Sequence, residues 1–294
     1  MLMLNNNLKI FITVAELASV TEAAKKLYVS QPAISQCLKK LENELGVKLF
    51  VRNKRSKLAL TRVGKEILGL AYQMTDLENK IYQTAYAENH MLEGSIRIAS
   101  VPLGLAIIMA KVLRHFKESF PLVKVELIEG SPLEVKKMVQ NFQVDLGIST
   151  SPYLNLEHKL LLKDRMVSIN RTTAKSIDLN KRIENLIISR IAHDSICEQL
   201  GSRGLSLVNS VIVEQASTQI NMLAGGNEDG IISELMLSTI PNKLVRGTVI
   251  PKIETEISLI APNFNELTAA AREMVLMIND TVGQPFAEND EWIT

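Results

Sequence analysis

Residues 18–64 constrain the fold more than any other stretch, because two helix patterns and a basic hairpin follow one another with hardly a spacer. Ser19 and Glu22 stand at capping-box spacing, which predicts the start of a short helix over about 21–28. Pro32 fits the first turn of a second helix, where its missing N–H costs nothing. The pattern therefore predicts a helix-turn-helix.

The second helix of this pair has an apolar and a polar face. Apolar residues recur at i, i+3, i+4, i+7 and i+11 from Ile34, which predicts a buried stripe that ends at Leu45. The other face carries small polar residues and one lysine, a composition that suits base edges and phosphates. We therefore expect this helix to contact duplex DNA through Ser30, Gln31, Pro32, Ser35, Gln36 and Lys39.

A basic turn follows between two short apolar segments, 49–50 and 58–60, which predict a β-hairpin. A solvated hairpin whose charges only aid solubility is one interpretation. Beside a recognition helix we favour a wing that contacts phosphates or the minor groove. Its predicted contact residues are Arg52, Lys54, Arg55 and Lys57.

The same stretch resembles the N-terminal domain of LysR-type transcriptional regulators. The match has almost no gaps and departs from the family at Val63, where Ala is usual, and at Ala18, where Gly is common. The resemblance implies a homodimer or homotetramer that binds a promoter operator, contacts RNA polymerase and responds to a small-molecule effector. It rests on SQPAIS at 30–35, Leu41, Glu42, Leu45, Gly46, Leu49, Phe50, Arg52, Leu60, Thr61 and Gly64.

Charge divides the chain at the end of this stretch. Residues 1–62 hold 11 Lys and Arg against 4 Asp and Glu, a net charge of +7, whereas residues 63–294 hold 22 against 28, a net charge of −6. A basic head on a mildly acidic body is expected of a DNA-binding module joined to a unit that does not bind DNA. The length of 294 residues also predicts two or three units.

Several signals for other protein classes are missing from the sequence. It has no apolar run of about eighteen residues and no signal-peptide pattern, so we expect neither a membrane span nor export. Cys37 and Cys197 fall in different expected units, which is no disulfide framework and fits a reducing cytoplasm. The four histidines lack metal-ligand spacing and no catalytic set has motif context. We expect no metal, no cofactor and no enzyme activity.

A long helix is predicted after the hairpin, from about 62 to 90, with Thr61 as a possible cap. Its apolar residues step by three and four, a heptad-like seam. The seam could pack on the chain's own body, but the head alone would not need so long a helix, so we favour a dimerisation helix. The seam consists of Ile67, Leu70, Met74, Leu77 and Ile81.

Beyond Gly94 the pattern changes to strands at 95–101, 124–128 and 145–149 with helices between them, followed less regularly by strands at 166–170, 208–214 and 256–261 and a helix at 266–282. Such alternation predicts an α/β fold with a parallel sheet. The layout resembles the family's effector domain, which has the two-lobe fold of periplasmic binding proteins. We therefore expect a multidomain chain: an all-α winged helix-turn-helix head (1–62), a linker and dimerisation helix with a hinge (63–93), and an effector-binding domain (94–294) with lobe one at 94–163 and 264–294 and lobe two at 164–263.

Ligands of open parallel sheets lie beyond the carboxyl ends of strands. Ser100, Ser131, Ser149 and Thr150 follow the first three strands. Each could simply cap a helix, but together they favour a small polar or anionic effector, and the family resemblance points most to Ser100 and Ser131. In lobe two, Ser189, Arg190 and His193 follow a strand end and are further candidates.

Other interpretations of the body are open. Residues 225–230 (GGNEDG) lack the Lys-Ser/Thr pair of a phosphate loop, so a tight turn is expected, where the family usually has a shorter turn with Pro at the position of Glu234. Cys197 could sense oxidants, although no resolving thiol is near it in the sequence. A transport-associated solute-binding protein and a two-lobe deaminase or lyase are the rival classes.

Overall fold

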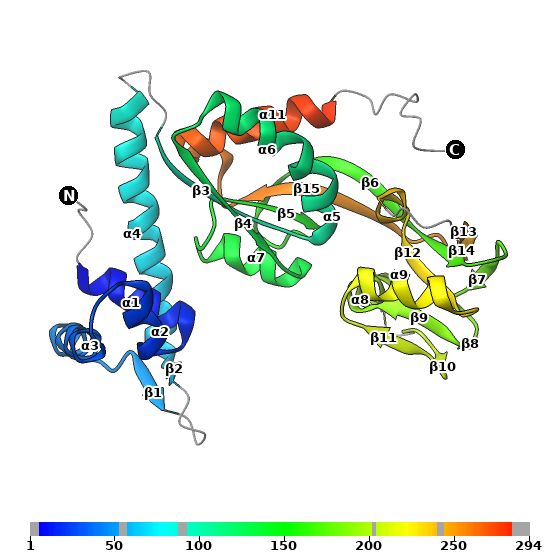
Figure 1. Ribbon diagram of the computed structural model, residues 1–294, viewed down its shortest axis with the longest axis horizontal. Coiled ribbons are helices and arrows are strands. Elements are labelled where there is room, and N and C mark those ends of the chain that lie inside the picture. Colours follow the sequence, from blue (N-terminus) through cyan, green and yellow to red (C-terminus); the bar gives the residue numbers. More distant parts are fainter. Residues whose placement is uncertain (1–5, 53–57, 88–92, 202–203, 240–243, 284–294) are drawn as a thin grey trace.

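The computed structural model describes residues 6–52, 58–87, 93–201, 204–239 and 244–283. A small helical head stands at one end of a long helix, and an elongated α/β body extends from the other (Figure 1). The winged helix-turn-helix expectation is confirmed. The head consists of α1 (Asn6–Leu17), α2 (Val20–Lys26), α3 (Gln31–Leu45), β1 (Phe50–Arg52) and β2 (Leu58–Leu60).

The head has its own apolar core. Phe11 and Ile34 are fully buried in it. The rings of Phe11 and Phe50 of β1 pack edge-on with 5.6 Å between their centroids, and this contact joins the hairpin to the helices. The Ser19 Oγ accepts from the Glu22 amide at 3.2 Å and caps α2 as predicted. The predicted stripe on α3 is wrong at Leu45, which is 45 % exposed, because the last three residues of the helix are all exposed.

The linker helix is α4 (Arg62–Ala87), which the Thr61 Oγ1 caps by accepting from the Gly64 amide at 2.8 Å. The part of the predicted helix beyond 87 lies outside the described residues. Ile67 packs on the head core, whereas the other four predicted seam residues are 47–59 % exposed. The apolar seam is therefore present on α4 and is not covered within this chain by the residues that the structure describes.

Lobe one is an α/β layer in which β3 is parallel to both of its neighbours. In Figure 1, α6 and α11 cover one face of its sheet and α7 the other. Its helices bury apolar residues against both faces, with one core cluster on each side. The elements are β3 (Gly94–Ser100), α5 (Pro102–Gly104), η1 (Leu105–Met109), α6 (Ala110–Ser119), β4 (Val123–Glu129), α7 (Pro132–Gln140), β5 (Leu146–Thr150) and α11 (Ala269–Gly283).

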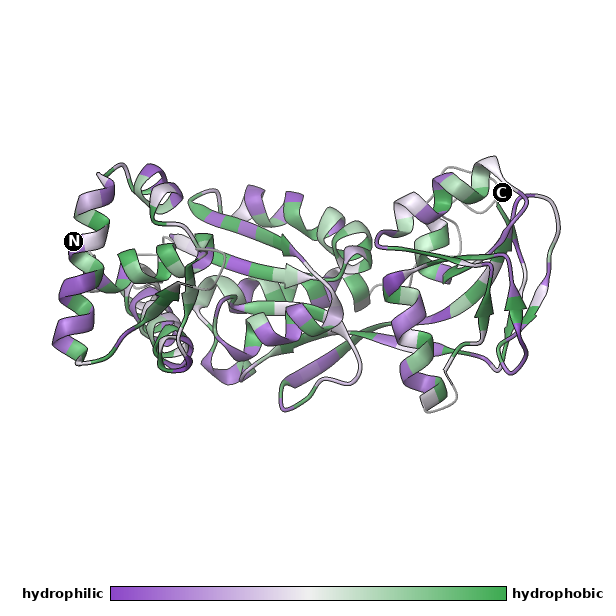
Figure 2. Cartoon of the chain, turned by 90° about the horizontal axis from the view of Figure 1, so that it is seen from below, coloured by the Kyte–Doolittle hydropathy of each residue, from purple (hydrophilic) through white to green (hydrophobic). Residues whose placement is uncertain are grey.

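Two long strands, β6 (Glu157–Asn170) and β15 (Glu254–Ala261), run antiparallel to each other and connect the lobes. Figure 2 shows mostly apolar strands in both lobes, with hydrophilic residues on the covering helices. None of the described helices is long and apolar enough to cross a bilayer. The remaining elements are β7 (Ser176–Asp178), β8 (Ile183–Glu184), β9 (Leu186–Ser189), α8 (Arg190–Leu200), β10 (Leu207–Val208), β11 (Val211–Val213), α9 (Ala216–Gly225), β12 (Asp229–Ser233), α10 (Glu234–Ser238), β13 (Val245–Arg246), β14 (Thr248–Ile250) and η3 (Phe264–Glu266).

Candidate functional site

The N-terminus of α3 presents an exposed polar surface. The Ser30 Oγ accepts from the Ala33 amide at 3.3 Å, so Ser30 is the N-cap, and Pro32 lies in the first turn. Ile34 and Leu38 turn inward to the head core. The structure brings the predicted contact residues Gln31, Pro32, Ser35, Gln36 and Lys39 together on the exposed side of this helix.

Two neighbouring lysines of α3 differ in their partners. The Lys40 Nζ lies 3.9 Å from the Glu44 carboxylate, one helical turn away. Lys39 is exposed and has no carboxylate within ion-pair distance among the described residues. Its ammonium group can therefore meet a phosphate without first breaking an ion pair.

Glu42 fixes the start of the hairpin to α3. Its Oε1 accepts from the amides of Leu49 (2.9 Å) and Phe50 (3.4 Å), and its Oε2 accepts from the Lys48 Nζ at 2.6 Å. Burial alone would raise the pKa of Glu42, but these hydrogen bonds outweigh it and lower the pKa. Glu42 entered the sequence reasoning only as a family residue, because its partners lie in the next element.

The hairpin pairs with Phe50 opposite Leu60, as two strands around a basic turn should. Arg52 ends β1, but its side chain is outside the described residues. Lys54, Arg55 and Lys57 also lie outside them. The wing contacts expected of these four residues stay predictions.

Tyr28 is a residue that sequence reasoning missed. It lies in the turn between α2 and α3, has a left-handed φ of 55° and is 95 % exposed. A bulky side chain in this backbone region is strained, and such strain is often found at functional positions. The sequence predicted Tyr28 as the last residue of the short helix over about 21–28, whereas α2 ends at Lys26, so a left-handed turn position was not expected.

The carboxyl ends of three lobe-one strands meet at one edge. Ser100 pairs in register with Ile148 on β5 and Glu129 on β4, and the Ser149 Oγ donates to the Pro132 carbonyl at 3.2 Å. This edge, called the hydroxyl edge below, holds Ser100, Ser131, Ser149 and Thr150. Ser100 and Ser149 are fully buried, and the Ser100 Oγ donates to the Val101 carbonyl. Ser131 caps α7 in a complete capping box with Glu134, so in this structure Ser131 serves as a helix cap, one of the two roles that the sequence left open.

Lys136 adds a positive charge to the hydroxyl edge. It is only 5 % exposed, yet its Nζ donates to two carbonyls, of Thr150 (3.2 Å) and Pro152 (2.7 Å), and no carboxylate is within ion-pair distance among the described residues. Burial lowers the pKa of Lys136, while the charge of Glu198 on α8 of the other lobe raises it. A buried ammonium without a counter-ion is a candidate anion site. Sequence reasoning missed it because a lysine within a helix usually faces solvent.

Two family models match the chain. Residues 5–65 match the bacterial regulatory helix-turn-helix protein, lysR family, and residues 89–283 match the LysR substrate binding domain. The chain belongs to the LysR family of transcriptional regulators. This LysR-family protein is accordingly a regulator with a DNA-binding helix-turn-helix domain and an effector-binding domain.

Relatives and solved structures agree with this assignment. The uncharacterized HTH-type transcriptional regulator YoaU of Bacillus subtilis (strain 168) is 38 % identical over 289 residues, covering 96 % of this chain and 100 % of YoaU. YvbU of the same organism is described in the same words and is 29 % identical, covering 94 % of this chain and 98 % of YvbU. A full-length OxyR variant from Pseudomonas aeruginosa has a TM-score of 0.69 at 20 % identity, covering 96 % of this chain and 95 % of OxyR. CbnR complexed with target DNA has a TM-score of 0.61 at 19 % identity, covering 94 % of this chain and 99 % of CbnR. At these identities, both structures support the fold alone.

The lobe-two candidates of this LysR-family regulator gather at the start of α8. Ser189 caps the helix by accepting from the Ala192 amide at 3.4 Å, and Arg190 pairs with Glu214 at 3.5 Å. The Cys197 Sγ lies 3.7 Å from the His193 Nε2.

The GGNEDG stretch joins α9 to β12 as a turn, in agreement with the sequence interpretation. The Asn170 side-chain amide donates to the carbonyls of Asn227 (3.3 Å) and Glu228 (3.1 Å) and so holds the turn in place. Glu234, where the family usually has Pro, begins α10 and pairs with Arg165 of β6 and Arg246 of β13. This ion cluster ties α10 to the connecting strand.

Proposed function

We propose that this LysR-family protein is a cytoplasmic regulator that binds a promoter operator as a homodimer or homotetramer and answers to a small anionic effector. The exposed polar face of α3 beside the hairpin is the observation that carries the DNA-binding part. Contact with RNA polymerase and the absence of catalysis are part of the proposal through the family. We take the head as 1–62, the linker as 63–93 and the effector domain as 94–294, with lobe one at 94–163 and 264–294 and lobe two at 164–263.

The contacts divide by chemistry. We assign base edges in the major groove to Gln31, Pro32, Ser35 and Gln36, with Ser30 at the helix start. Lys39 and Arg52 take phosphates, and the wing adds Lys54, Arg55 and Lys57. Phosphate contacts fix the position of the head, whereas base contacts select the sequence.

A salt titration of duplex binding tests the phosphate assignment. Lys39→Ala should reduce the slope of log affinity against log salt by about one, since one phosphate is no longer neutralised. Lys40→Ala is the matched control, because Lys40 is paired with Glu44 on the same helix. Equal slopes for the two variants would remove Lys39 from the interface.

Self-association is supported by the exposed apolar seam of α4. Leu70, Met74 and Leu77 remain uncovered within the described chain, and an apolar seam of this length is typical of a helix that pairs with a second copy. Two heads would then meet successive turns of the duplex.

The effector part rests on Lys136 at the hydroxyl edge. A buried cation that contacts the carbonyls of Thr150 and Pro152 suits a carboxylate or sulfonate group. Thermal stabilisation by a panel of acidic metabolites, with their neutral amides as controls, tests this assignment. Acidic compounds should stabilise the wild-type protein but not Lys136→Met, whereas turnover of any of them would support the rival enzyme class.

A further inference from the structure

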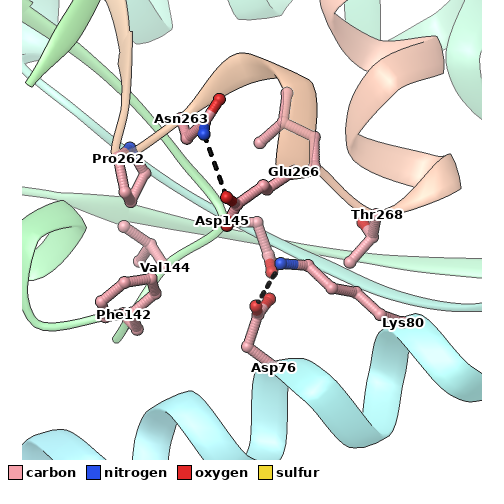
Figure 3. Close-up of a pocket in the computed structure, with 10 residues that line it drawn as sticks. Asp76, Lys80, Phe142, Val144, Asp145, Pro262, Asn263, Glu266 and Thr268 are labelled. Atoms are coloured by element: carbon pink, nitrogen blue, oxygen red, sulfur yellow. Dashed lines mark hydrogen bonds and ion pairs between the residues drawn. The ribbon is translucent and has the colours of Figure 1, made fainter.

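A pocket separates the linker helix from lobe one. Its volume of about 30 Å³ is enough for one water molecule. Asp76 and Lys80 of α4 line one side, and Asp145, Glu266 and Thr268 of lobe one line the other (Figure 3). The pocket is thus the place where the helix that carries the head touches the lobe that carries the hydroxyl edge.

Asp145 is the unusual residue of this pocket. It is 7 % exposed, and its Oδ2 accepts from the Arg97 amide at 2.6 Å, with the Arg97 Nε at 3.9 Å. Its buried Oδ1 has no hydrogen-bond partner among the described residues. Burial raises the pKa of Asp145, which is the sign of a carboxylate that is poorly satisfied where it stands. A buried acceptor in this state needs an explanation.

The linker helix supplies the opposing charge. The Lys80 Nζ forms an ion pair with the Asp76 Oδ2 at 2.9 Å, and both side chains are largely shielded from solvent. Lys80 and Asp145 line the same pocket from opposite sides (Figure 3). The charge of Lys80 lowers the pKa of Asp145 and that of Asp76 raises it, so the three groups interact across the boundary between α4 and lobe one.

The same side of α4 also reaches the head. Tyr72, one helical turn before Asp76, is buried, and its hydroxyl donates to the Glu16 Oε1 of α1 at 3.2 Å. Gln143 of lobe one hydrogen-bonds the same tyrosine. A single helical face therefore contacts the head at one position and lobe one at the next.

Strand β5 joins this pocket to the hydroxyl edge. Asp145 directly precedes β5, and Ser149 and Thr150 end it. The strand is held on both sides, by β3 and β15, and all of its residues except Thr150 are buried, so it transmits displacement along its length with little bending.

We propose that Asp145 and the Lys80–Asp76 ion pair form a joint through which lobe one positions the linker helix, with β5 connecting the joint to the hydroxyl edge. That the joint responds to an effector rests on the proposed function, whereas the docking of α4 on lobe one is independent of that function. Asp145 and Lys80 are positioning residues in this proposal. They contact neither DNA nor effector.

Amide hydrogen exchange of the full-length protein tests the docking. Lys80→Met and Asp145→Asn each remove one charge of the joint, so exchange of the amides of 76–82 should quicken about tenfold. Lys117→Met, exposed on α6, is the matched control for the loss of a lysine. Exchange equal to that of the control in both variants would overturn the joint.

Asp145→Asn also separates positioning from a purely structural role. The amide can still accept from Arg97, and it no longer buries an unsatisfied charge, so the melting temperature should stay equal or rise while α4 exchanges faster. A lower melting temperature with faster exchange in β3 and β5, and none in α4, would show that Asp145 serves only the fold of lobe one.

A double-mutant cycle tests the connection along β5 without any effector. Lys136→Met removes the hydrogen bond to the Thr150 carbonyl at the far end of the strand. This substitution should quicken hydrogen exchange in α4 when it is made in the wild-type protein, but not when it is added to Lys80→Met. Additive effects would overturn the connection. If the cycle is non-additive but acidic compounds stabilise Lys136→Met as well as wild type, the effector assignment fails and the joint stands.

Discussion

Two glycines of the linker helix should respond to alanine in opposite directions. A Cβ on Gly64 would lie 2.2 Å from the carbonyl oxygen of Leu49 and 3.1 Å from the Thr61 Oγ1, whereas a Cβ on Gly69 would have nothing within 4 Å. Real Cβ contacts are essentially never shorter than 3.0 Å, so at Gly64 the helix and the hairpin must separate by at least 0.8 Å. Only Gly fits the position where α4 crosses the hairpin.

The magnitude follows from what that separation breaks. The Leu49 carbonyl also accepts from the Thr61 amide at 2.9 Å, and Leu49 is fully buried in the head core. Overpacking of about 1–3 kcal/mol and a lost hydrogen bond of about 1 kcal/mol are offset by about 1 kcal/mol of helix propensity. Gly64→Ala should therefore destabilise the junction of head and linker by about 1–3 kcal/mol. Gly69→Ala keeps only the propensity contribution and should stabilise α4 by up to about 1 kcal/mol.

Local opening measured by hydrogen exchange is the suitable assay, because a chain of several domains does not unfold in one step. The amides of 60–70 should exchange faster in Gly64→Ala and slower in Gly69→Ala than in wild type. Two variants with the same sign of change would refute the contact at Leu49 and, with it, the way the hairpin is seated on α4.

Three further substitutions test other parts of the molecule. Glu42→Gln should quicken hydrogen exchange of the Leu49 and Phe50 amides at neutral pH, whereas Glu44→Gln, exposed on the same helix, should change it little. Because the pKa of Glu42 is lowered from 4.5, the slower exchange of the wild type is present above that value and should vanish as pH falls through the folded-state pKa, which an exchange series over pH would show. Tyr28→Gly relieves a left-handed φ and should leave the melting temperature unchanged or raise it by a few degrees, whereas a drop measured by calorimetry would mean that the ring supports the fold. Leu77→Glu places a charge in the exposed seam and should lower the apparent mass in sedimentation, and an unchanged mass would exclude the seam from the interface between copies.

The head could be predicted closely because its signals are local. Ser19, Ser30 and Pro32 mark helix starts within a few residues of themselves, and the structure places α2 and α3 there. The error at Leu45 has a tertiary cause, since periodicity continued after the helix had run past the core that covers it. Capping and periodicity report on a helix, not on where its neighbours end.

The body was harder because its geometry depends on residues far apart in the sequence. The 14-residue strand β6 was expected only over 166–170, since its first four residues are exposed and the charged residues Lys163, Asp164 and Arg165 separate its two apolar stretches. A strand over 208–214 divides into β10 and β11, because Asn209 turns the chain with a left-handed φ of 47°. The hydroxyl edge could be predicted from the order of the strands. Lys136 and Asp145 could not be predicted as functional residues, because only the structure shows that Lys136 is buried and that the buried Asp145 Oδ1 has no hydrogen-bond partner among the described residues.

Helix α4 has to satisfy two neighbours at once. Its polar residues Tyr72, Asp76 and Lys80, which are buried or partly buried, follow each other by four and face the head and lobe one. The exposed apolar residues Leu70, Met74, Leu77 and Ile81 occupy a different side. A turn of the helix about its axis would therefore disturb both sides together. In the proposed dimer, an apolar seam paired with a second copy would resist such rotation. The proposed joint of Asp145 with the Lys80–Asp76 ion pair would then influence the head of either copy only by moving the paired helices as one body.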